Sequence, residues 1–162
     1  MDLKTYSLDD VLLAALKSEH DSRDIYKELA SRTKNAFLKE RLEFLSGEEE
    51  KHRVFIEGLY RDRIGKEPVL PEKSPVPLPE IRAEDDTPLS EVFTMAMEAE
   101  KAVSDFYRSM AEQFFSDSSV SKTLVYLSIM EMGHYSVLEM EREVLLRQED
   151  LELTWDMMHV GP

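Results

Sequence analysis

The sequence has no cysteine, few glycines and little positive charge. Without cysteine, disulfides, zinc fingers, iron–sulfur clusters and thiol nucleophiles are excluded. Only five glycines occur in 162 residues, and no stretch is rich in strand-forming residues, so helix is favoured over sheet. The formal net charge of −14 argues against nucleic-acid binding, which needs clustered Lys and Arg, and against docking on anionic membranes.

Long apolar runs are missing as well. No window approaches the roughly 18 apolar residues that mark a membrane span. The N-terminus, Met1 to Lys4, lacks the basic start and apolar run of a signal peptide. We therefore expect a cytoplasmic protein. Its length and its hydrophobic fraction of 42 % fit a single domain over residues 1–162.

The prolines divide the chain into two halves. Six of the seven lie between Pro68 and Pro88, so residues 65–86 are predicted to form an extended crossover without helix. On either side, apolar residues recur at helical spacing and predict two helix pairs. The two predicted pairs cover residues 8–63 and 88–148. A tail over residues 151–159 is expected to add one or two helical turns.

The two halves are an internal repeat. Shifting the first helix by 81 positions or the second by 82 aligns identical residues, and these include carboxylates and histidines as well as apolar residues. A repeat that served only the core would match at apolar positions alone, so the polar matches need a chemical reason. The matched pairs that carry chemistry are Glu19 with Glu100, Tyr26 with Tyr107, Glu49 with Glu131, and His52 with His134.

The repeated polar residues indicate a two-metal site. Each Glu-x-x-His motif places a carboxylate and an imidazole one turn apart on one helix face. Four carboxylates inside a helical bundle must be paired or bind metal, and two divalent cations would balance their charge. One Glu from each of two helices plus Glu-x-x-His from the other two is the known pattern of di-iron and di-manganese bundles. The predicted metal ligands are Glu19, Glu49, His52, Glu100, Glu131 and His134.

Two features have competing interpretations. Glu49 lies in a run of three glutamates that would ordinarily be a solvated charge cluster, but the repeat selects it because its neighbours align with methionines. Tyr26 and Tyr107 each lie seven residues past a predicted ligand, which returns them to the same helix face. They are either packed core tyrosines or hydrogen-bond partners of the carboxylates, with a supporting role in catalysis.

The motifs AALKSEHDSRDIY with EEEKHR, and MEAEKAVSDFY with EMGH, resemble those of the rubrerythrin family of ferritin-like di-iron proteins. The resemblance covers nearly all of residues 8–148 outside the crossover. It implies an all-α, ferritin-like four-helix bundle of up-down-down-up topology, with the long crossover between the second and third helices. It also implies two iron ions, with manganese or zinc as alternatives. By this analogy Glu49 and Glu131 bridge the ions, Glu19 and His52 complete one, and Glu100 and His134 the other.

Two departures from the family affect the expected function. The sequence lacks the four cysteines of the rubredoxin domain that rubrerythrins usually carry, and Val103 replaces an extra glutamate one turn after Glu100. The resemblance implies a rubrerythrin-like peroxidase that reduces hydrogen peroxide or dioxygen, with electrons from an external donor such as a rubredoxin, and a homodimer. The alternatives are a ferroxidase or iron-binding protein of ferritin type, and a non-catalytic metal-binding bundle.

Overall fold

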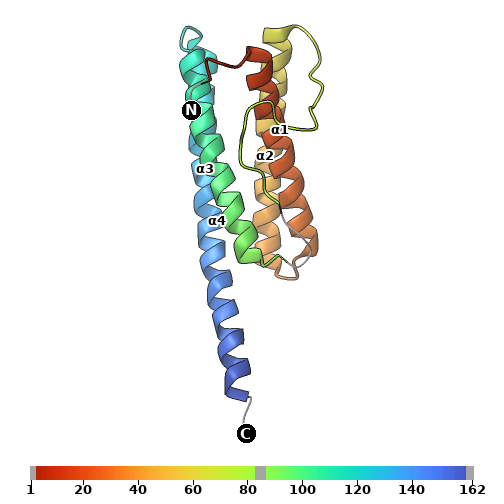
Figure 1. Ribbon diagram of the computed structural model, residues 1–162, viewed down its shortest axis with the longest axis vertical. Coiled ribbons are helices and arrows are strands. Elements are labelled where there is room, and N and C mark those ends of the chain that lie inside the picture. Colours follow the sequence, from red (N-terminus) through yellow and green to blue (C-terminus); the bar gives the residue numbers. More distant parts are fainter. Residues whose placement is uncertain (1–2, 83–86, 160–162) are drawn as a thin grey trace.

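The computed structural model describes residues 3–82 and 87–159, and this part of the chain contains four helices and no strand. The helices are α1 (Leu8–Arg32), α2 (Ala36–Ile64), α3 (Leu89–Gln113) and α4 (Ser118–His159). Figure 1 shows two antiparallel hairpins side by side, α1 with α2 and α3 with α4. Because α2 and α3 point the same way, the topology is up-down-down-up, as predicted. The fold is a four-helix bundle of the ferritin-like type.

Local sequence signals place the helix ends. Ser7 and Asp10 form a capping box that satisfies the first free N–H groups of α1. The side chain of Asn35 accepts from two backbone N–H groups of α2, and Asp117 does the same for α4. Gly65, with φ 76°, ends α2 in the left-handed conformation that favours glycine.

The crossover joins the C-terminal end of α2 to the N-terminal end of α3, which lies at the opposite end of the bundle (Figure 1). Residues 66–82 contain neither helix nor strand, as their prolines predict, and they run along the bundle (Figure 1). Val76 anchors this segment because its side chain is fully buried in the core, and Leu78 packs partly against the same core. The last predicted crossover residues, 83–86, lie outside the described residues.

Helix α4 is longer than the sequence predicts. It runs without a break to His159, whereas the apolar pattern predicts an end near residue 148 followed by a separate short tail. No glycine or proline lies between Gly133 and Gly161, so no backbone signal stops the helix earlier. The C-terminal part of α4 projects beyond the rest of the bundle (Figure 1).

The core consists of two apolar clusters, one toward each end of the bundle, with a polar layer between them. One cluster gathers Leu12, Ile56, Phe106, Met110 and Leu124 among others, and the second gathers residues of all four helices further along. Burying each such side chain contributes about 1.5–3 kcal/mol to the stability of the fold. The second cluster includes Tyr26, Leu29, Leu38, Leu42, Leu45, Val92, Phe93 and Leu138.

No helix in the described part is long and apolar enough to cross a membrane.

Candidate metal centre

The polar layer holds all six predicted ligands. Every helix contributes to it: α1 and α3 give one glutamate each, while α2 and α4 each give a glutamate and a histidine one turn apart. All six side chains are buried, with exposed fractions of 1–3 %. Acidic side chains are almost never buried without a partner, so this layer needs compensating charge.

The six residues form two overlapping groups that could each hold a metal ion. In each group, four potential ligand atoms lie within 4.8 Å of one another. Glu49 and Glu131 belong to both groups, which is the relationship expected of bridging carboxylates. The first group is Glu19, Glu49, His52 and Glu131, and the second is Glu49, Glu100, Glu131 and His134.

The two histidines reach across the boundary between the hairpins. Nδ1 of His52 lies 2.8 Å from Glu131 Oε1, and Nδ1 of His134 lies 2.9 Å from Glu49 Oε1. The two rings stack, with centroids 5.5 Å apart and planes 18° apart. The Nδ1 atoms of both rings therefore face the carboxylates at the centre of the layer.

Burial and mutual repulsion shift the protonation of this layer. Burial, together with the charge of Glu131, raises the pKa of Glu19 well above its ordinary value, and burial with the charge of Glu49 does so for Glu100. Burial also disfavours the ionised form of Glu131, but the imidazoles of His134 and His52 outweigh it and lower its pKa to about 2. Burial opposes the charged form of His52 as well, yet the adjacent carboxylates raise its pKa to about 12.

Several atoms of the layer are buried without a hydrogen-bond partner. They include Glu19 Oε2, Glu49 Oε1, His52 Nδ1 and Glu131 Oε1, although His52 and Glu131 are close enough for an ion pair. Unsatisfied buried polar atoms are rare, and each requires an explanation. Carboxylate oxygens and imidazole nitrogens are ligand atoms that suit iron, manganese and zinc. The residues present thus fit two metal ions, which would bind the unpaired carboxylate oxygens and would displace the proton that the His52 ring carries.

The two tyrosines contact the carboxylates of the opposite half. The Tyr26 hydroxyl donates a hydrogen bond to Glu100 Oε1, and the Tyr107 hydroxyl donates to Glu19 Oε1. Of the two interpretations left open by the sequence, the structure shows hydrogen-bond partners, and both side chains are also fully buried. The sequence places each tyrosine on the same helix face as the ligands. It does not show that each tyrosine contacts a glutamate of the other hairpin.

A cavity lies beside the layer, and no pattern in the sequence predicted it. It has a volume of about 490 Å³ and lies between α1, α3 and the crossover. Its lining includes Ser18, Ser22 and Ala99, which lie within one turn of ligands, but these residues form no motif. The sequence could have given one signal, because the crossover has to pass along the bundle and cover a groove.

The fold and the buried carboxylate–histidine layer define a ferritin-like bundle with a site that could hold metal. The sequence model of the rubrerythrin family matches residues 10–142, and the chain therefore belongs to the rubrerythrin family. No curated protein sequence matches the chain. Among solved structures it is similar to a hypothetical protein from Pyrococcus furiosus, with 31 % identity, a TM-score of 0.73, and coverage of 89 % of this chain and 93 % of that one.

Proposed function

We propose that this protein holds two iron ions in the polar layer and reduces hydrogen peroxide, or less readily dioxygen, with electrons from an external donor. The observation that supports this most directly is the pair of overlapping four-residue groups that share Glu49 and Glu131. A lone structural carboxylate would not need a second group of identical composition beside it. Membership of the rubrerythrin family supports iron over other metals.

In the proposed centre, each ion has its own ligands and shares two others. Glu19 and His52 would hold one ion, Glu100 and His134 would hold the second, and Glu49 and Glu131, which belong to both groups, would be shared. Two divalent ions would balance the four carboxylates and would remove the repulsion that, together with burial, raises the pKa values of Glu19 and Glu100.

When bound, two ferrous ions would supply the two electrons that reduction of a peroxide O–O bond needs (H₂O₂ + 2 H⁺ + 2 e⁻ → 2 H₂O). The protein fixes the terminal carboxylates through Tyr26 and Tyr107. Burial, reinforced by the neighbouring glutamates, raises the pKa of both tyrosines, so their hydroxyls remain protonated donors at neutral pH. The apolar clusters on either side limit the entry of bulk water.

Two partners belong to this proposal. The 162 residues contain no cysteine and hence no iron–cysteine centre of their own, so the electrons are proposed to come from a separate donor such as a rubredoxin. A homodimer is proposed on the family resemblance alone, and sedimentation that finds a stable monomer would contradict it.

The test is anaerobic loading with Fe(II), followed by rapid mixing with hydrogen peroxide or with dioxygen under absorbance detection. Peroxide should oxidise the bound iron much faster than dioxygen. Glu49→Gln should abolish the reaction. Glu48→Gln is the matched control, because this neighbouring glutamate pairs with Lys51 outside the layer and should leave the rate unchanged. Faster oxidation by dioxygen with retention of the product iron would instead establish the ferroxidase alternative.

A further inference from the structure

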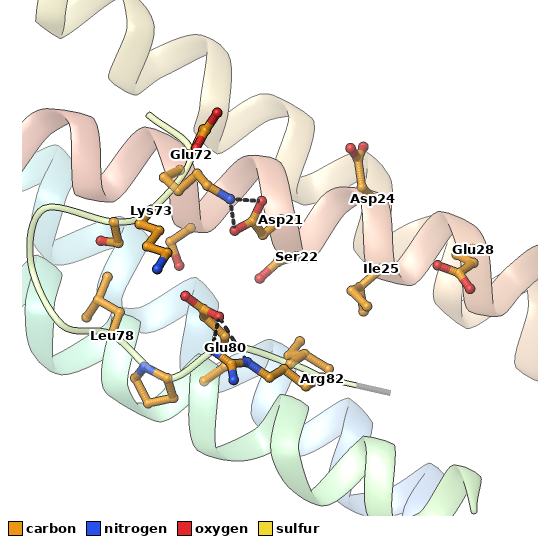
Figure 2. A pocket seen from close by; sticks show the side chains of 16 residues that line it. Asp21, Ser22, Asp24, Ile25, Glu28, Glu72, Lys73, Leu78, Glu80 and Arg82 are labelled. Atoms are coloured by element: carbon orange, nitrogen blue, oxygen red, sulfur yellow. Dashed lines mark hydrogen bonds and ion pairs between the residues drawn. The ribbon is translucent and has the colours of Figure 1, made fainter. Parts of the chain in front are cut away.

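The cavity beneath the crossover lies on the α1–α3 side of the polar layer. Figure 2 shows its walls: α1 carries Asp21, Ser22 and Ile25, and the crossover passes opposite them with Leu78 and Glu80. The Ser22 side chain points from α1 toward the gap between α1 and α3. The volume of about 490 Å³ lies within the range of small-molecule sites.

The floor of this cavity adjoins the ligands. Ser18 directly precedes Glu19 in the chain, and Ser22 follows that glutamate by one helical turn. From the other wall, Ala99 directly precedes Glu100 and also lines the cavity. Both glutamates that belong to only one four-residue group thus have small neighbours that line the cavity, while the six ligands themselves lie behind its wall.

Within the described part of the chain, a second groove lies on the α1–α2 face, lined among others by Ser46 and Gly47, and the remaining sides of the layer are packed. The two apolar clusters block both ends along the bundle axis. On the α1–α2 and α3–α4 sides, Ser46 and Ser104 each donate a hydrogen bond to the neighbouring helix of their own hairpin. On the fourth side, the stacked rings of His52 and His134 lie between α2 and α4.

We propose that the cavity beneath the crossover is the entrance by which metal ions and small polar oxidants such as hydrogen peroxide reach the polar layer, and that Ser22 sets its width. This inference rests on the proposed metal centre. The cavity lining carries five acidic and three basic side chains, with Lys17 paired to Asp21 and Arg82 paired to Glu80, so its charge favours metal cations and does not repel a neutral oxidant.

The repeat supports a special role for Ser22. Its equivalent in the second half, 81 positions on, is Val103, which is buried with 4 % of its surface exposed. Ser22 is only half-buried and lines the cavity. The second half thus has a buried apolar residue, Val103, at this position. The first half has a small polar residue, Ser22, on the side where the cavity lies.

The experiment measures the rate of Co(II) uptake by the metal-free protein, followed by the visible spectrum of bound cobalt. Ser22→Phe places a ring in the cavity and should slow uptake by at least about tenfold, because the ring raises the barrier to entry. Ser22→Ala removes the hydroxyl without filling the space and should keep the wild-type rate. Gly47→Phe is the matched control, since Gly47 lies two residues from the ligand Glu49, lines the groove on the α1–α2 face, and has no atom within 4 Å of an added Cβ.

Equilibrium titration separates this inference from the proposed function. If the wild type fails to bind two Co(II) ions per chain, the metal centre itself is wrong. If it binds two, but Ser22→Phe and a second plug, Ser18→Phe, both take up cobalt at the wild-type rate, the entrance lies elsewhere and the inference is overturned. Slow uptake in both plugged variants with unchanged stoichiometry, alongside a normal rate in Gly47→Phe, would support it.

Discussion

The hydroxyl of Tyr26 donates a hydrogen bond to Glu100, so a tyrosine of the first hairpin supports a carboxylate of the second. The converse holds for Tyr107, which donates to Glu19. Each terminal glutamate therefore depends on the opposite hairpin for its orientation. Since the pairs are related by the repeat, they offer matched experiments within one protein.

Tyr26→Phe should weaken the ion held by Glu100 and His134 and leave the ion held by Glu19 and His52 less affected. A hydrogen bond to a charged group is worth about 1.5–3 kcal/mol, so we expect one of two Co(II) affinities to fall by roughly tenfold to a hundredfold. Stepwise titration under calorimetry would measure both affinities.

The matched control for that experiment is Tyr107→Phe, which should weaken the other ion. If Tyr26→Phe behaves like Glu19→Ala rather than like Glu100→Ala, the crossed contacts do not act on the metal. A double substitution of Tyr26 and Glu100 should show strong non-additivity, because the two residues are in direct contact.

Substitution of a shared ligand should differ from substitution of a terminal one. Glu131→Ala removes a member of both groups and is expected to lose both metal ions, together with peroxide turnover. Glu19→Ala removes a member of one group and should lose mainly the ion shared with His52. Elemental analysis after iron loading would give the two stoichiometries, and equal losses in both variants would contradict the assignment of Glu131 as a bridge.

The metal-free protein should respond in opposite directions to changes at Glu131 and Glu19. Because the pKa of Glu131 is lowered from 4.5 to about 2, its charge stabilises the fold above that range, and the contribution is lost as the pH falls toward 2. Glu131→Gln should therefore destabilise the protein in chelator at neutral pH, by about 3 kcal/mol at most. The melting temperature would fall by up to roughly 10 °C.

Glu19 has the opposite sign. Its pKa is raised, so the contribution that it makes to stability at low pH is lost as the pH rises, and at neutral pH the residue disfavours folding. Glu19→Gln mimics the protonated form and keeps an acceptor for Tyr107, so the metal-free variant should melt at the wild-type temperature or higher. A lower melting temperature for Glu19→Gln than for Glu131→Gln would contradict this distinction.

Metal binding should release protons and tighten as the pH rises. The pKa of His52 is raised from 6.5 to about 12, so in the metal-free protein this ring is protonated at neutral pH, and a bound ion must displace that proton. The apparent affinity for Co(II) should therefore rise by about tenfold or more per unit between about pH 6 and pH 8. Calorimetry in buffers of different ionisation enthalpy would count the released protons, and binding without proton release would contradict the prediction.

The sequence predicted the four helices because the apolar period and the positions of the prolines agree along Leu8–Ile64 and again after Pro88. It also predicted which six side chains would meet, since Glu19, Glu49 and their repeat equivalents are polar residues at positions that otherwise carry core residues. It could not place the end of α4, because no stop signal follows Gln148 and an apolar pattern sets a helix boundary only weakly.

The electrostatic differences among the four glutamates also lay beyond the sequence. Glu19 and Glu131 are equally buried, yet the pKa of one is raised and that of the other is lowered. The difference arises because both imidazoles approach Glu131, which depends on how the two hairpins are placed against each other. Helical periodicity fixes the face on which a residue lies, but not its neighbours on another helix.

Each four-residue group takes three side chains from one hairpin and one from the other: Glu19, Glu49 and His52 with Glu131, and the reverse. Two identical hairpins, associating about a two-fold axis, would therefore supply the same complete set without any crossover. When both hairpins lie in one chain, equivalent positions can carry different residues. A symmetric pair would have to carry the same residue at positions 22 and 103, whereas the fused chain has serine at one and valine at the other, and so can open one flank of the bundle while keeping its equivalent packed.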